Sequence, residues 1–113
     1  MNNKTIFFLL LSLVLLPLYA FAATRVGGWS PIKNISDPHI IEVGEFAVSE
    51  YTRETKSDLN FVTIVSGESQ VVAGMNYRLV ITANHTGKSK NYEAIVWEKP
   101  WLKSMNLTSF KPV

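Results

Sequence analysis

Two histidines, His39 and His85, are the first candidates for acid–base chemistry in this chain. His39 stands close to Asp37 and Glu42, and a histidine between two carboxylates could belong to an acid–base set. His85 is far from His39 in the sequence and lies in a polar segment. Asp37 and Glu42 also suit a helix cap and a solvated helix face. We adopt that interpretation and expect the protein not to be an enzyme.

Composition excludes several other kinds of site. The chain has 113 residues and no cysteine, so it can have no disulfide, thiol nucleophile or thiolate metal ligand. The sequence contains no metal-ligand spacing and no glycine-rich phosphate loop, so we expect no metal and no cofactor. Eleven basic residues nearly balance nine acidic ones, and no basic run is interleaved with aromatic residues. We therefore expect no nucleic acid as a partner.

Two segments combine apolar side chains with turn residues. Gln70-Val71-Val72-Ala73-Gly74 has two valines where a chain reversal usually has Asn, Asp or Gly. Lys99-Pro100-Trp101-Leu102 has a tryptophan and a leucine beside a proline. Apolar residues exposed on loops usually indicate a binding surface. The alternative is that these residues are strand ends, and the residues alone leave both interpretations open.

The first 22 residues have the pattern of a secretory signal peptide. Lys4 is their only charged residue, an apolar run extends from Ile6 to Leu16, and Ala20-Phe21-Ala22 resembles a cleavage site. The run is shorter than the ~20 apolar residues of a membrane-spanning helix, which disfavours a membrane anchor. We predict cleavage after Ala22 or Ala23 and a mature domain at residues 23–113. We also predict secretion to the extracellular space or the vacuole, with no membrane association after cleavage.

Three Asn-x-Ser/Thr sequons lie in the mature chain, at Asn34, Asn84 and Asn106. In a secreted glycoprotein each is a candidate glycosylation site on a surface loop. Chance occurrence is the alternative, because a three-residue pattern recurs often.

A helix is the first element that could position these residues. Asp37-Pro38 suits the N-cap and the first helical position, and apolar residues recur with helical period from His39 to Ser57. Gly44 lies on the apolar face, where it costs about 1 kcal/mol relative to alanine, and Phe46 lies off that face. A glycine on the apolar face predicts a close crossing over a flat surface, so we expect the helix to cover a sheet.

After Asp58 the apolar period changes to two. Four segments rich in β-branched and aromatic residues are predicted strands: Leu59–Val72, Met75–Ala83, Tyr92–Glu98 and Thr108–Val113. Residues 84–91 are a predicted polar hairpin tip, and Gly67 is predicted to mark a β-bulge. One helix followed by four strands with short connections predicts an α+β domain, in which an antiparallel meander wraps the helix.

Three separated motifs resemble those of the cystatins: Gly27-Gly28, Gln70-Val71-Val72-Ala73-Gly74 and Pro100-Trp101. The helix segment 43–51 and the segment 92–101 are similar to those of plant cystatins, the phytocystatins. The resemblance covers residues 26–113 in the family's order and spacing. Two departures lie in the helix, Gly44 for the usual Ala and Tyr51-Thr52 for the frequent His-Asn, and they concern stability more than inhibition.

The resemblance implies a cystatin-like fold and a reversible, tight-binding competitive inhibitor of papain-like cysteine proteases. One amphipathic helix would be wrapped by a four- to five-stranded antiparallel sheet, with the fifth strand near Trp29 to Lys33. An N-terminal arm and two hairpin loops would block the protease cleft. The target would be an endogenous protease or, in plant defence, one of a pest or pathogen. The implied protease-binding residues are Val26, Gly27, Gly28, Gln70, Val71, Val72, Ala73, Gly74, Pro100 and Trp101.

The alternative function is a secreted glycan- or surface-binding module that uses Trp29, Trp97 and Trp101 as stacking platforms. For the oligomeric state we expect a monomer that can form a domain-swapped dimer when the segment 70–74 straightens. Some phytocystatins carry a second inhibitory domain against legumain-type proteases. We expect none here, because the sequence does not extend past Val113.

Overall fold

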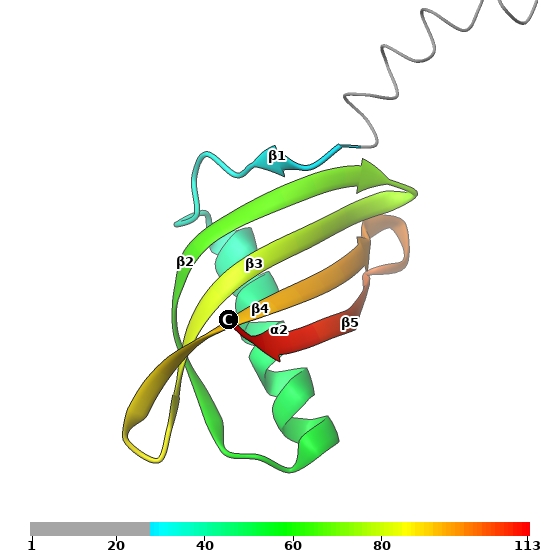
Figure 1. Ribbon diagram of the computed structural model, residues 1–113. Coiled ribbons are helices and arrows are strands. Elements are labelled where there is room, and N and C mark those ends of the chain that lie inside the picture. The colour runs from blue at the N-terminus through cyan, green and yellow to red at the C-terminus, as the bar shows by residue number, and fades with distance from the viewer. Residues whose placement is uncertain (1–27) are drawn as a thin grey trace, which may run out of the picture.

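In the computed structural model, residues 28–113 are described, and they form a five-stranded antiparallel sheet curved around one helix (Figure 1). The strands follow one another across the sheet in chain order, which confirms the predicted α+β meander. The predicted signal peptide, Val26 and Gly27 lie outside the described residues. In chain order the elements are β1 (Ser30–Pro31), α2 (Pro38–Thr55), β2 (Leu59–Val72), β3 (Gly74–His85), β4 (Lys88–Lys99), the short 3-10 helix η1 (Pro100–Leu102) and β5 (Ser104–Pro112).

Helix α2 begins as predicted, because the Asp37 carboxylate accepts a hydrogen bond from the His39 amide at 2.8 Å and Pro38 occupies the first turn. It ends at Thr55, slightly before the predicted Ser57, because Lys56 adopts the left-handed conformation with φ of 55°. Within residues 28–113, no helix is both long enough and apolar enough to span a membrane.

The close crossing predicted at Gly44 is confirmed. A Cβ atom at this position would lie 3.0 Å from both Ile64 Cδ1 and Phe61 Cε1, so the glycine lets α2 approach β2. Phe46 was expected off the apolar face, but it is half-buried against the core. The sheet curves around the helix (Figure 1), so residues beside the apolar stripe can also pack against the core.

Strands β3 and β4 supply most of the core with alternate side chains. The buried positions are Tyr77, Leu79, Ile81 and Ala83 on β3 and Tyr92, Ala94 and Val96 on β4. The polar segment 84–91 was expected to be a hairpin tip, but pairing continues to His85 and Lys88, so the two strands are joined by Thr86 and Gly87. Hydrophobic alternation does not reveal this extension, because both faces of the hairpin end are exposed to solvent.

Two sequons consequently lie in strands and not in loops. Asn84 is in β3, and its side-chain oxygen accepts a hydrogen bond from the Gly87 amide at 2.9 Å. Asn106 is in β5, which begins at Ser104 and not at the predicted Thr108. Asn34 precedes the turn before α2, and its side-chain oxygen accepts from the Ser36 amide at 3.1 Å.

The bulge predicted at Gly67 is wrong in its position. The register of β2 against β3 shifts between Phe61 and Thr63 and again between Ile64 and Ser66, while Gly67 pairs regularly with Leu79. A Cβ atom on Gly67 would lie 2.7 Å from Leu79 Cδ2 and 3.0 Å from Ile32 Cδ1. The lack of a side chain at Gly67 therefore lets Leu79 and Ile32 pack closely against the backbone of β2.

Candidate functional site

Three segments that are far apart in the sequence converge at one end of the sheet (Figure 1). Because Met75 pairs with Glu98, the β2–β3 turn lies directly beside the connection from β4 to β5. Strand β1 pairs with β2 through Ser30 and Ser69, and continuing this register places Gly28 beside Val71. We call Gly28, residues 70–74 and residues 100–102 the wedge, with the β2–β3 turn as its first loop and η1 as its second loop.

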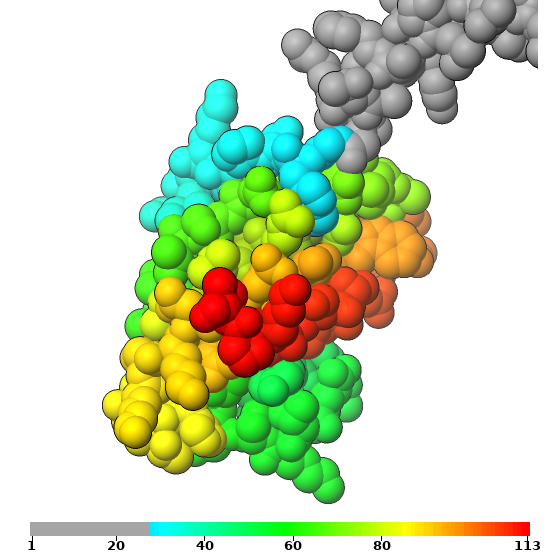
Figure 2. Space-filling model, in the orientation of Figure 1, coloured from blue at the N-terminus to red at the C-terminus, as the bar shows by residue number. Residues whose placement is uncertain are grey.

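Both loops of the wedge expose apolar side chains, and the two loops lie side by side in Figure 2. Val71 is 49% exposed and Val72 39%, while Trp101 is 63% and Leu102 61% exposed. An apolar patch at the end of a sheet is costly in water unless a partner covers it. Val71 and Val72 are the last residues of β2, so the strand-end interpretation is correct for them, whereas Trp101 and Leu102 lie in η1; the side chains of all four are exposed.

The first loop is a very tight reversal. Val72 pairs with Gly74, so Ala73 alone spans the turn. Gly74 has φ of 99°, and a Cβ atom there would lie 2.3 Å from the carbonyl oxygen of Glu98. Only glycine combines this backbone conformation with such a close approach, so Gly74 lets the end of the first loop lie against β4 just before the second loop. The resemblance implied Gly74 only as a protease-binding residue, and this structural role was missed.

The second loop is held by its own backbone. Pro100 occupies the start of η1, and the Lys103 amide donates a hydrogen bond to the Pro100 carbonyl at 3.0 Å. Lys103 has φ of 48° and ends the turn. Trp101 is therefore presented to solvent on a short rigid turn, which suits a large contact residue with little conformational entropy to lose.

Gln70 lies at the base of the wedge. It pairs with Asn76 across β2 and β3, and its side-chain oxygen accepts a hydrogen bond from the Asn76 amide group at 3.3 Å. The side chain is half-buried, so Gln70 supports the first loop as well as lining it.

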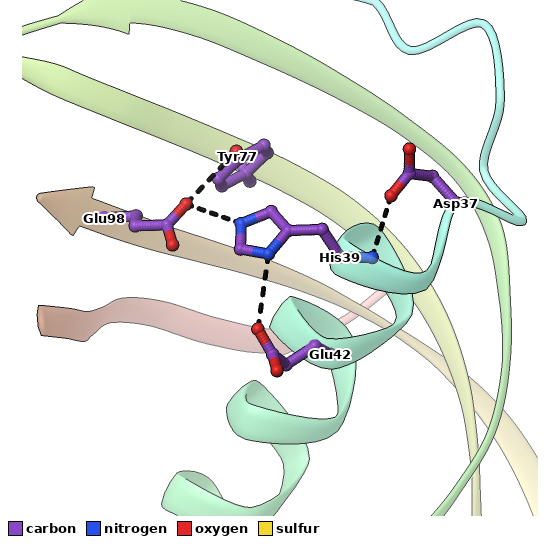
Figure 3. Close-up of polar contacts among 5 residues, drawn as sticks. All are labelled: Asp37, His39, Glu42, Tyr77 and Glu98. Carbon is purple, nitrogen blue, oxygen red and sulfur yellow. Dashed lines mark hydrogen bonds and ion pairs between the residues drawn. The ribbon is translucent and has the colours of Figure 1, made fainter. Parts of the chain in front are cut away.

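A polar cluster lies between the start of α2 and strands β3 and β4 (Figure 3). His39 Nε2 is 2.8 Å from Glu98 Oε1, and His39 Nδ1 is 3.2 Å from Glu42 Oε1. The Tyr77 hydroxyl donates to Glu98 Oε1 at 3.2 Å. When His39 is protonated, both ring nitrogens donate to carboxylates. The cluster joins the start of α2 to Glu98, near the end of β4.

The hydrogen bond with Glu98 raises the pKa of His39 above its ordinary value of 6.5 and outweighs the effect of partial burial. Burial, with a contribution from the charge of Glu98, raises the pKa of Tyr77 to about 12. Glu98 is only 7% exposed, and sequence reasoning did not identify it. The alternation along β4 could have identified this residue, because Glu98 occupies the next inward-facing position after Tyr92, Ala94 and Val96.

We expect this cluster to make stability depend on pH. Folding favours protonated His39, so the contribution is complete below pH 6.5 and is lost as pH rises through the raised pKa. The effect should stay under about 1 kcal/mol, because the His39 side chain is partly exposed. Urea unfolding at pH 6 and pH 8.5 should show a free energy that falls with pH in the wild type and falls less in His39→Gln. His85→Gln is the control, and equal pH dependence in the wild type and His39→Gln would contradict the assignment.

Of the two carboxylates considered with His39 for an acid–base set, Glu42 does lie against the imidazole ring. The Asp37 carboxylate caps α2, and the His39 ring faces Glu98 and Glu42. His85 lies at the far hairpin, where its Nδ1 is 2.9 Å from the Asp58 carbonyl oxygen. Among residues 28–113, no group of three or more His, Cys, Asp or Glu side chains could hold a metal ion.

Comparison with known proteins agrees with this architecture. A family model described as "Aspartic acid proteinase inhibitor" matches residues 32–113. "Cysteine proteinase inhibitor 5" of Arabidopsis thaliana is 64% identical over 99% of this chain and 94% of that protein. "Cysteine proteinase inhibitor 1" of Actinidia chinensis var. chinensis is 48% identical over 77% of this chain and 75% of its own length.

Two solved structures show the same fold. The salivary cystatin of the soft tick Ornithodoros moubata has a TM-score of 0.66 at 24% identity, covering 77% of this chain and 97% of its own. The squash aspartic acid proteinase inhibitor has a TM-score of 0.61 at 25% identity, covering 76% and 93%. The fold is thus that of the cystatins, which are proteinase inhibitors and not enzymes. Within that class, the chain belongs to the plant cysteine proteinase inhibitor family, which confirms the resemblance seen in the sequence.

Proposed function

We propose that the protein is a reversible, tight-binding competitive inhibitor of papain-like cysteine proteases and that the wedge fills their active-site cleft. The observation that carries the binding mode is the convergence of the three segments, which expose Val71, Val72, Trp101 and Leu102 at one end of a rigid sheet. The names of the plant relatives support cysteine proteases as the target class.

The composition of the wedge suits a narrow cleft. Val71, Val72 and Ala73 bring apolar atoms that exclude water, and Trp101 supplies a large rigid anchor. Gly27 and Gly28 would let the arm approach the catalytic centre without a clashing side chain, while Val26 would fill a neighbouring subsite. The first loop reverses at Ala73 alone, so it offers the nucleophile no extended peptide to cleave. Blocking the cleft requires no catalytic residue of the inhibitor's own.

Aspartic proteases are a second candidate target. The family model and the squash protein both have names that refer to aspartic acid proteinases. An inhibition panel should therefore include pepsin beside papain.

The glycan-binding alternative loses support from the structure. The Arg78 guanidinium lies 4.3 Å from the centre of the Trp29 ring, and the Lys99 amine lies 4.2 Å from that of Trp97. Each ring thus has a cation on one face, which leaves Trp101 as the highly exposed tryptophan of the three.

Truncating Trp101 tests the proposed function directly. The wild type should inhibit papain, and Trp101→Ala should raise the inhibition constant by about 30-fold, because a central aromatic anchor typically contributes about 2 kcal/mol or more. Trp101 is mostly exposed, so the fold should be unaffected. Val62→Ala, which removes an exposed side chain outside the wedge, should leave the constant unchanged. Papain that stays fully active at micromolar concentrations of folded wild-type protein would overturn the proposal, and inhibition of pepsin alone would move the target to aspartic proteases.

We also propose that the chain is made with a signal peptide at residues 1–22 and is secreted to the extracellular space or delivered to the vacuole. Asn34 and Asn106 are exposed and are the best-placed glycan acceptors. Mass spectrometry of the chain secreted by plant cells should find an N-terminus at Ala23 or Thr24 and a mass that glycosidase lowers. A chain retaining residues 1–22 would exclude the cleavage.

A further inference from the structure

Trp97 forms a hydrogen bond with the tip of the first loop. Its indole Nε1–H donates a hydrogen bond to the Ala73 carbonyl oxygen at 2.9 Å. Ala73 is the one residue that spans the reversal, and Trp97 belongs to a different strand, β4. The hydrogen bond therefore ties the tip of the β2–β3 turn to the end of β4, close to the second loop.

The same side chain also contacts Lys99, the residue that directly precedes the second loop. The Lys99 amine lies 4.2 Å from the centre of the Trp97 ring, and Lys99 is followed at once by Pro100. Beside the ring is a shallow hollow of about 350 Å³ lined by Val72, Ala73, Asn76, Trp97 and Thr108. Trp97 thus borders the space beneath the first loop and meets the residue that leads into the second.

We infer that Trp97 is a positioning residue that fixes the two loops at the spacing required for inhibition before the protease arrives. This inference rests on the proposed function, because it concerns the geometry of the wedge. Val72 and Trp101 would make the contacts, and Trp97 would act through them. A loop that is ordered in advance loses less conformational freedom on binding, so this anchor increases affinity.

The test compares the same chemical change at two tryptophans. Trp97→Phe keeps an aromatic ring but removes the N–H donor to Ala73, and Trp101→Phe makes the same change at the exposed contact residue. One net hydrogen bond corresponds to about a fivefold to tenfold change in an equilibrium. Trp97→Phe should therefore raise the inhibition constant for papain by about that factor and speed amide hydrogen exchange at Val72, Ala73 and Gly74. Trp101→Phe should weaken inhibition while leaving that exchange unchanged.

A second measurement uses the wild-type protein, so its result does not depend on whether the Trp97→Phe variant folds. In the free protein, the indole proton of Trp97 should exchange with solvent more slowly than that of Trp101, because only the former is bonded to a carbonyl of the loop. Equal exchange of the two indole protons would overturn the inference.

The variant has two further outcomes that count against the inference. An unchanged inhibition constant for Trp97→Phe would show that the anchor does not serve inhibition. A weakened constant with unchanged loop exchange would make Trp97 a direct contact and not a positioning residue. Failure of the proposed function is distinguishable from both, because then the wild type itself would leave papain active while the exchange measurements still report on the anchor.

Discussion

Replacing Val72 with aspartate should weaken inhibition of papain by about 100-fold while leaving the fold intact. Val72 is the last residue of β2, and its side chain is 39% exposed at the tip of the first loop. In the proposed complex this position enters a dry cleft, where an unpaired carboxylate loses its hydration and gains no partner. In the free protein the carboxylate remains in water. The expected loss is therefore one of binding and not of stability.

Val62 offers a matched control. It is also a valine of β2, it is 51% exposed, and it lies outside the wedge. Val62→Asp should change the inhibition constant for papain by less than twofold, and both variants should unfold in urea close to the wild type. Equal inhibition by Val72→Asp and the wild type would show that the first loop does not enter the cleft.

Gly74 is not a suitable site for this experiment, although its position in the motif points to it. Any side chain there would meet the Glu98 carbonyl and would strain a backbone with φ of 99°. Weaker inhibition by Gly74→Glu could then arise from a disturbed junction between the loops and not from a charge in the cleft. Val72 separates these two effects because its backbone is an ordinary strand.

The sequence predicted the fold well wherever a local signal exists. The Asp37-Pro38 cap, the helical period and the alternation of β2 each depend on residues close together in the chain, and the structure confirms these elements. The predicted segments for β3 and β4 were shorter than the strands at both ends, and the predicted segment for β5 began too late. Polar residues at the solvated hairpin end carry no alternation that would extend β3 and β4. In β5 the alternation of Met105 and Leu107 with exposed Asn106 and Thr108 was present and was missed, and the register against β4 shifts just after it.

For the site, composition identified both loops but not how they are held together. The valines at 71 and 72 and the Pro100-Trp101 pair are unusual for loops, which is a local signal. The close approach of Gly74 to Glu98 and the hydrogen bond from Trp97 to Ala73 depend on the register of β3 against β4. The ion pair of His39 with Glu98 depends on how α2 packs against β4. That register and that packing are properties of the folded protein, so these contacts could be found only in the structure.

Warming the protein to just below its unfolding midpoint should produce a domain-swapped dimer that has lost papain inhibition. Val71 and Val72 are β-branched and favour extended backbone, yet they lead into a reversal at Ala73. Straightening the first loop would join β2 and β3 into one strand and carry β1, α2 and β2 onto a second chain. The pairing of β2 with β3 and the packing of α2 on the sheet would be rebuilt between the chains, so burial is conserved.

Exchange should be slow at room temperature, because β2 must first separate from β3 along its whole length and the hydrogen bond from Trp97 to Ala73 must break. The dimer would no longer present the first loop, so size-exclusion fractions assayed against papain should show inhibition in the monomer and none per chain in the dimer. Val71→Asn should reduce the dimer yield by making the reversal easier. A dimer that inhibits fully per chain, or the absence of any dimer from wild-type protein under partly unfolding conditions, would contradict this mechanism.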